Sequence, residues 1–239
     1  MIAGALQPRQ LTGLDDAHLV TLDCGNRLHV DAAQAFTALQ AEAARAGFTL
    51  AIASSFRSCE RQLAIWNGKA TGARPIYDAA DNALEIAGLT NAQLLHAILR
   101  FSALPGTSRH HWGTDVDVFD AGAVPGDYAV QLCAAEVAHG GVFDPLHCWL
   151  DARMSADQSH GFFRPYAVDR GGVAAERWHL SYAPLAQDCG GRLVAKALRD
   201  CWNELELNEP LLLRDTVEQM LPEILQRYVN VPQNWCTPP

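Results

Sequence analysis

Residues 107–120, which read TSRHHWGTDVDVFD, constrain the fold of this chain more than any other segment. In the second half of the segment polar and apolar residues alternate, which is typical of a β-strand. Val116 and Val118 lie on one face of such a strand, whereas Asp115 and Asp117 share the opposite face. The sequence therefore predicts a strand with two carboxylates on one of its faces.

Helical and strand patterns surround this segment. Residues 31–46 begin with a capping Asp31, continue with apolar residues at helical spacing and end at Gly47, as expected of a helix. The short apolar run 48–53 predicts a buried strand, and Arg57 follows shortly after its end. Further helices are expected at 59–66, 91–102, 143–154, 189–207 and 209–229, and a further strand at 176–182. This mixture of element types permits an α+β fold.

The length and composition favour one ordinary domain, with room for an appended helical segment. The chain has 239 residues, of which 49% are hydrophobic and 19% charged, so it can bury a core and does not belong to the disordered or collagen-like classes. Its net charge of -9 offers no basic surface to a phosphate backbone. Nucleic acid is therefore not expected as a partner.

The N-terminus and the cysteines carry no targeting or cross-linking pattern. The apolar stretch 2–6 is too short for the core of a signal peptide, and no Lys or Arg precedes it, which favours a cytoplasmic location without fixing the compartment. No run approaches the roughly 18 apolar residues of a membrane span. The seven cysteines are scattered and form no CxxC pair, so neither a disulfide framework nor a zinc ribbon is expected.

Four polar residues could together form a hydrolytic metal site: His110, Asp117, Glu176 and His179. Two imidazoles and one carboxylate are a common ligand set for catalytic zinc, and they leave one coordination position for water. Zinc lowers the pKa of that water to about 7, and a nearby carboxylate can take its proton. Glu176 is placed for the role of this base.

Spacing alone leaves the relation between Glu176 and His179 open. Residues three apart point to opposite sides of a strand, so only a bulge or a turn at Glu176 would let both address one metal. The helical zinc motif HEXXH does not occur in the sequence, and neither does the GxSxG elbow of serine hydrolases or the Walker loop of NTPases. Serine hydrolase and NTPase functions therefore have no support.

Three separated motifs resemble those of the zinc D-alanyl-D-alanine carboxypeptidases, a family of the LAS metallopeptidases that includes VanY-like enzymes. Residues 108–117 resemble the family pattern SxHxxGxAxD, and residues 176–179 resemble ExWH. Residues 54–62 resemble SGYRSxxxQ. The resemblance spans roughly residues 22–184.

The resemblance implies a metal site and a base. In this family the matching positions bind zinc, which assigns the ligands to His110, Asp117 and His179. The matching position in ExWH is the general base, which assigns that role to Glu176. His111 adjoins the first ligand, and the motif count selects His110.

The resemblance also implies residues that contact substrate. Arg57 would bind substrate and stabilise the oxyanion that develops at the scissile carbonyl, a role that suits a guanidinium because it stays charged. Ser108 and Gln62 would lie near the substrate and hold its peptide or terminal carboxylate groups. Asp115 departs from the family pattern, which has Ala there. Its carboxylate could ligate the metal, orient a histidine or face solvent.

The fold that the resemblance implies is α+β, with a central, mainly antiparallel sheet flanked by helices. We expect a zinc peptidase domain over residues 1–185. Residues 186–239 would form a C-terminal helical extension packed on the same domain.

The implied activity is that of a zinc-dependent carboxypeptidase of the cell wall. Its substrates would be peptidoglycan stem peptides, or their fragments, that end in D-alanine. Family relatives also include L,D-carboxypeptidases, D,D-dipeptidases and endopeptidases, and the sequence does not separate these. The alternative is a catalytically silent, zinc-containing module that binds peptidoglycan or protein, against which the presence of Arg57 and Glu176 argues.

Overall fold

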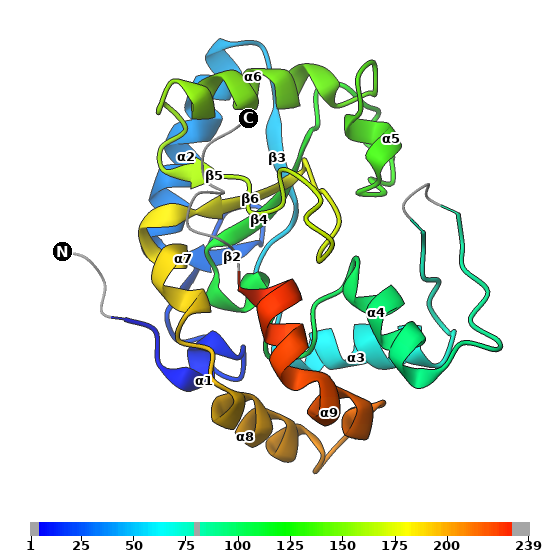
Figure 1. Cartoon of the computed structure of the whole chain (residues 1–239). Coiled ribbons are helices and arrows are strands. Elements are labelled where there is room, and N and C mark those ends of the chain that lie inside the picture. Colours follow the sequence, from blue (N-terminus) through cyan, green and yellow to red (C-terminus); the bar gives the residue numbers. More distant parts are fainter. Residues whose placement is uncertain (1–4, 79–81, 231–239) are drawn as a thin grey trace.

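An antiparallel sheet of four strands forms the centre of the protein (Figure 1). The computed structural model describes residues 5–78 and 82–230. The strands follow the order β3-β4-β6-β5, and β1 and β2 form a separate antiparallel pair. Their bounds are β1 Leu19–Thr21, β2 Arg27–His29, β3 Leu50–Ser54, β4 Asp115–Asp120, β5 Phe162–Phe163 and β6 His179–Tyr182.

Helices account for most of the remaining secondary structure. Their bounds are α1 Pro8–Leu11, α2 Val30–Arg45, α3 Cys59–Ala70, α4 Asn91–Leu99, α5 Ala134–Val137, α6 Asp144–Ser155, α7 Ala183–Gly190, α8 Ala195–Leu205 and α9 Arg214–Ile224. A 3-10 helix, η1 (Arg109–Trp112), precedes β4, and a π-helix, η2 (Leu225–Val229), continues α9. The expected α+β fold with an antiparallel sheet flanked by helices is confirmed.

One face of the sheet is covered by α2 and α6. Val116 and Val118 of β4 are fully buried there, together with Phe36 of α2 and Leu146 of α6. The apolar residues of α2 recur every three or four positions, which gives the helix one buried stripe. The expected Asp31 cap is wrong: the N-cap of α2 is His29, whose side chain accepts a hydrogen bond from the backbone of Asp31.

Most of the other helices contribute to a second apolar cluster, away from α2 and α6 (Figure 1). It joins α1, α3 and α4 to the C-terminal helices α8 and α9, with Trp66, Trp112 and Trp202 fully buried inside it. The indole of Trp66 donates to the carbonyl of Leu212 at 3.0 Å, and that of Trp202 to the carbonyl of Pro105 at 2.8 Å. Helices α8 and α9 thus share one apolar cluster with α1, α3 and α4.

Several predicted element boundaries are wrong. Two of them are helix ends, since α3 continues to Ala70 and α4 stops at Leu99. A continuous helix over 189–207 does not form, because α7 ends at Gly190 and α8 starts only at Ala195. The helix expected from residue 209 begins at Arg214, after Leu213 with a positive φ of 62°. The strand expected over 176–182 begins at His179. The last nine residues of the predicted extension, 231–239, lie outside the described part of the chain.

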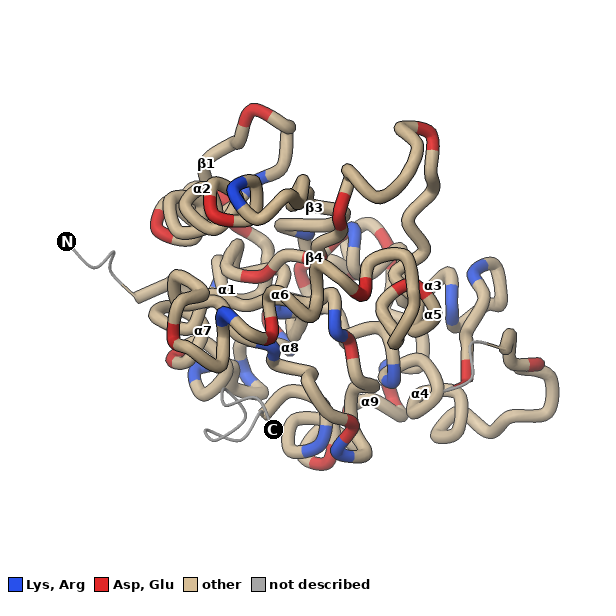
Figure 2. The backbone as a smooth tube through the Cα atoms, turned by 90° about the horizontal axis from the view of Figure 1, so that it is seen from above, with Lys and Arg blue, Asp and Glu red and all other residues tan. Residues whose placement is uncertain are grey.

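Charged residues and cysteines are spread along the described part of the chain. Lys and Arg on one hand, and Asp and Glu on the other, are both spread over the molecule in Figure 2. Six cysteines fall in the described part and all are free; the sulfurs of Cys59 and Cys201 lie 3.0 Å apart. The seventh, Cys236, lies outside it. Within the described residues, helices long and apolar enough to cross a membrane are not found.

Candidate active site

The predicted metal ligands come from three different elements that meet on the face of the sheet opposite α2. His110 lies in η1, Asp117 in β4, and His179 is the first residue of β6. Asp117 and His179 are register partners in neighbouring antiparallel strands, so their side chains project from the same face.

Gly113 explains how η1 can lie so close to β4. The residue ends η1 with a positive φ of 70°, a conformation that favours glycine. A Cβ at this position would collide with the side chain of Leu19 and come within 2.9 Å of the backbone nitrogen of His29. The glycine of the HxxGxxxD spacing therefore turns the chain between the first histidine and the aspartate.

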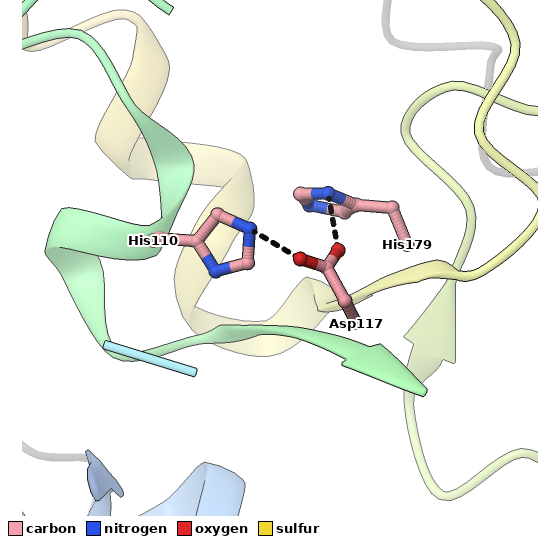
Figure 3. A group of neighbouring side chains, drawn as sticks. All are labelled: His110, Asp117 and His179. Carbon is pink, nitrogen blue, oxygen red and sulfur yellow. Dashed lines mark ion pairs between the residues drawn. The ribbon is translucent and has the colours of Figure 1, made fainter. Parts of the chain in front are cut away.

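The three side chains converge closely (Figure 3). His110 Nε2 lies 3.3 Å from Asp117 Oδ2, and His179 Nδ1 lies 3.3 Å from Asp117 Oδ1. One potential ligand atom from each residue falls within 4.8 Å of the others, and all three residues are buried.

This geometry fits a metal ion. Two ligand atoms at about 2.0–2.1 Å from a tetrahedral zinc ion lie about 3.3 Å apart, which is the separation seen between the carboxylate of Asp117 and each imidazole. Asp117 Oδ1 is buried and forms no hydrogen bond within the described residues. A buried carboxylate oxygen without such a partner is costly unless a cation compensates it.

Asp115 orients His179. Its Oδ1 lies 2.9 Å from His179 Nε2, which leaves Nδ1 of the ring for the shared point near Asp117. The Asp115 carboxylate also accepts hydrogen bonds from Arg109 at 2.8 Å and from Ser181 at 3.0 Å. Of the three roles left open by the sequence, the structure thus shows the orientation of a histidine.

Opposite charges hold this cluster in its ionised form. Burial acts to raise the pKa of Asp117, but His110 and His179 outweigh it and keep that pKa well below the usual range. Burial also acts to raise the pKa of Asp115, but opposing interactions, of which the charge of Arg109 is the largest, hold it well below its usual range. Burial lowers the pKa of His179, yet its carboxylate neighbours raise it well above the ordinary value. The carboxylates therefore favour added positive charge at this point, which a proton or a metal cation can supply.

Glu176 reaches the same point from a turn. Because β6 begins only at His179, Glu176 lies before the strand, and its backbone carbonyl accepts a hydrogen bond from His179 N at 3.2 Å. Its Oε2 lies 3.4 Å from His179 Nδ1. The turn resolves the difficulty that residues three apart on a strand face opposite sides.

Arg57 faces this cluster from the end of β3. Its guanidinium donates to Gln62 Oε1 at 2.8 Å and to Ser54 Oγ at 3.2 Å. Burial lowers the pKa of Arg57, against the opposing effect of Asp117 and Glu176. Gln62 is fully buried, and its amide nitrogen donates a hydrogen bond to the carbonyl of Ala103 at 2.7 Å. The structure thus places Gln62 behind Arg57.

His111 is a structural residue. It is fully buried, with Nδ1 lying 2.6 Å from the carbonyl of Arg57 and Nε2 accepting a hydrogen bond from the backbone of Gly106 at 3.1 Å. Burial lowers the pKa of His111 to about 3, so its imidazole is neutral. Both ring nitrogens are occupied, in agreement with the motif count that selects His110.

A cavity of about 180 Å³ joins these residues. Arg57, Ser108, His110, Glu176 and His179 line it, and the described part offers no hydrogen-bond partner to the hydroxyl of Ser108. Among the aromatic and apolar lining residues, Trp178 belongs to the ExWH motif, whereas Tyr166, Val173 and Tyr228 lie outside the three motifs. The Tyr166 and His179 rings lie 5.1 Å apart.

Comparison with known proteins identifies related sequences. A protein-family model described as "VanY: D-alanyl-D-alanine carboxypeptidase" matches residues 25–185. Two proteins of Haemophilus influenzae, both described as uncharacterized, are also similar. One is 48% identical over 103 residues, which cover 41% of this chain and 70% of that protein. The other is 31% identical over 127 residues, which cover 53% of this chain and 92% of that protein.

Solved structures with a similar chain path include vancomycin-resistance enzymes. A mutant of the D,D-pentapeptidase VanY from a VanB-type cassette, in complex with Zn(II), aligns with a TM-score of 0.49 and 26% identity over 70% of this chain and 79% of that chain. VanYB in complex with D-alanine-D-alanine aligns with a TM-score of 0.49 and 23% identity over 78% and 90% of the two chains.

Proposed function

Because this chain belongs to the VanY D-alanyl-D-alanine carboxypeptidase family, and is accordingly a peptidase, we propose that it is a zinc-dependent carboxypeptidase acting on peptidoglycan-type peptides that end in D-alanine. One observation carries the proposal. His110, Asp117 and His179 converge beside Glu176 and Arg57 in a single cavity. This arrangement supports the proposal, because it brings together candidates for a metal site, a base and a cation for the oxyanion.

The metal would be held by His110 Nε2, the carboxylate of Asp117 and His179 Nδ1. A zinc ion bound there would act as a Lewis acid that activates water and polarises the scissile carbonyl. Asp115 serves this site by fixing the ring of His179, as carboxylate partners of metal-bound histidines commonly do.

Glu176 moves the proton. Its carboxylate is 13% exposed, lines the cavity and lies beside the ligand atom of His179. From this place it can take a proton from the attacking water and deliver it to the nitrogen of the leaving D-alanine. The turn that precedes β6 is what lets Glu176 and His179 serve one reaction.

Arg57 stabilises the negative charge that develops on the carbonyl oxygen. Its partly buried guanidinium stays charged and presents donors in a fixed plane, which suits this task. Gln62 acts through Arg57, because both polar ends of its amide are bonded to the protein. We therefore propose a positioning role for Gln62 in place of direct substrate contact. Ser108 lines the cavity and offers its hydroxyl to the peptide.

The test is a hydrolysis assay on a synthetic peptide that ends in D-alanyl-D-alanine, with zinc content measured on the same samples. The wild type should release D-alanine. Glu176→Gln should keep zinc and lose activity by about a hundredfold or more, whereas Glu60→Gln, an exposed residue of α3, should change neither. A zinc-loaded wild type that binds the peptide without cleaving any bond would favour the silent binding module, and release of other products would indicate an L,D-, dipeptidase or endopeptidase specificity.

A further inference from the structure

A second cavity adjoins the site cavity. Its volume is about 430 Å³, against about 180 Å³ for the site cavity. Tyr166, Val173 and Tyr228 line both cavities. The two cavities therefore share a wall, and the metal ligands line the smaller one.

The second cavity lies between the loop 165–173 and the π-helix η2, and these two segments are in direct contact. Arg227 of η2 donates from Nε to the carbonyl of Gly171 at 2.5 Å. A Cβ at position 172 would collide with the carbonyl oxygen of Arg227. Gly172 therefore permits an approach of loop and helix that a larger residue would prevent.

Further contacts fasten both segments to α4. Arg100, the C-cap of α4, pairs with Asp169 and donates to the carbonyl of Gly172 at 2.5 Å. On the side of η2, the hydroxyl of Tyr228 lies 2.9 Å from His96 Nδ1. The walls of the second cavity are therefore tied to α4, and Tyr228 is held in place.

The charge of the second cavity is unbalanced. Arg170 lines it and is exposed, and within residues 5–78 and 82–230 it has neither an ion pair nor a side-chain hydrogen bond. Arg227 by contrast is paired with Glu223 at 3.3 Å, and Glu223 also lies 3.7 Å from His96 Nε2. One guanidinium thus faces the cavity without a partner from the described chain, and a carboxylate is the group it pairs with best.

We propose that the second cavity binds the part of a peptide that lies on the amino-terminal side of the scissile bond, and that Arg170 pairs with a carboxylate there. The inference rests on the proposed function, because a carboxypeptidase releases only the last residue and the rest of its substrate must extend away from the metal. The second cavity provides that space. Its loop wall, with Arg170, lies within residues 25–185 that match the family, whereas its η2 wall lies outside them, so the C-terminal segment completes this subsite.

The test compares three substrates of the zinc-loaded enzyme. The first is a pentapeptide that ends in D-alanyl-D-alanine and carries free carboxylates on its second and third residues. The second is the same peptide with both carboxylates amidated, and the third is N-acetyl-D-alanyl-D-alanine. Arg170→Gln should raise KM for the acidic pentapeptide about tenfold, as expected for one charged hydrogen-bonded pair, and leave its kcat unchanged. KM for the amidated pentapeptide and for the short substrate should not move.

Arg192→Gln is the matched control, since Arg192 is an exposed arginine that lines neither cavity. Equal KM values of Arg170→Gln and wild type on the acidic pentapeptide would overturn the subsite while the proposed function stands. If the wild type cleaves none of the substrates, calorimetric binding of the acidic tetrapeptide product still decides the subsite: Arg170→Gln should weaken this binding about tenfold, and unchanged binding would refute it.

Discussion

His179 Nε2 lies 2.9 Å from Asp115 Oδ1, so the imidazole is held between Asp115 and Asp117, two carboxylates on the same face of β4. Asp115 contacts Nε2 of the ring, and Asp117 contacts Nδ1. Arg109 and Ser181 fix Asp115 in turn. The candidate metal site therefore depends on a buried carboxylate that would not itself touch the metal.

Asp115→Asn should weaken zinc binding by about 10–100-fold, because the amide no longer orients and polarises the imidazole of His179 as a carboxylate does. Competition with a chromogenic chelator measures the affinity. Asp120→Asn is the control. Asp120 lies in the same strand and accepts hydrogen bonds from the backbone nitrogens of Thr49 and Gly122, so this variant should bind zinc like wild type. Wild-type zinc affinity in Asp115→Asn would show that the pair does not support the metal.

Direct removal of a ligand should have a larger effect. Purified wild type should carry about one zinc ion per chain, and His110→Ala or His179→Ala should lose it, since three protein ligands are the usual minimum for such a site. Elemental analysis of the purified proteins measures the content. His111→Ala removes a neighbouring imidazole that we place outside the ligand set. The folded fraction of this variant should therefore still bind zinc. Stoichiometric zinc in both ligand variants would contradict the assignment.

Arg57→Lys should lower kcat more than it raises KM. A lysine keeps the charge but loses the planar donors that Gln62 and Ser54 hold in place, and the loss in transition-state stabilisation should be about 2–4 kcal/mol. Steady-state kinetics on a D-alanine-terminated peptide and on its C-terminally amidated form separate the two constants. Arg61 is an exposed neighbour on α3, and Arg61→Lys should leave both kcat and KM unchanged. A rise in KM alone would assign Arg57 to anchoring of the terminal carboxylate.

The sequence predicted the parts of the site that local pattern determines. Alternation in β4 placed Asp115 and Asp117 on one face, and the short strand before Arg57 brought that residue to a strand end. Local pattern could not place Glu176, since the start of β6 depends on pairing with β4 and not on the residues before His179.

Long-range packing explains the remaining differences. Gln62 matches a motif position near substrate, yet it lies behind Arg57 because α3 packs against the chain at Ala103. Tyr228 reaches the site cavity from a segment with no motif, through a contact with His96 that is 132 positions away in sequence. Neither arrangement has a signature within a short window of residues.

The C-terminal helices should contribute strongly to global stability. Trp202→Ala should lower the free energy of unfolding by about 3–5 kcal/mol, because Trp202 is fully buried in α8 and its indole donates to Pro105. Urea denaturation measures the change. Leu207→Ala alters a side chain that is 83% exposed and should cost less than about 0.5 kcal/mol. Separate melting of the C-terminal helices, with the rest unaffected, would show that they are not part of the common core.

His147 should make the protein less stable in mild acid. Its ring is fully buried in α6, and burial, together with the nearby charges of Arg164 and Arg177, lowers its pKa from 6.5 to about 3. Below pH 6.5 the unfolded chain therefore binds a proton at His147 that the folded chain does not, so stability falls with falling pH until about pH 3. Between pH 7 and 4.5 the loss from this residue should be about 2.5 kcal/mol.

His147→Asn isolates this contribution. The asparagine amide does not titrate, and its oxygen can still accept from Arg164, which lies 3.3 Å from His147 Nδ1. Urea unfolding of both proteins from pH 8 to 4.5 should give parallel curves above pH 7.5. Below pH 6.5 the variant should lose less stability, by about 1.4 kcal/mol per pH unit. Curves that stay parallel to pH 4.5 would mean that His147 takes up a proton equally well in the folded and unfolded chains.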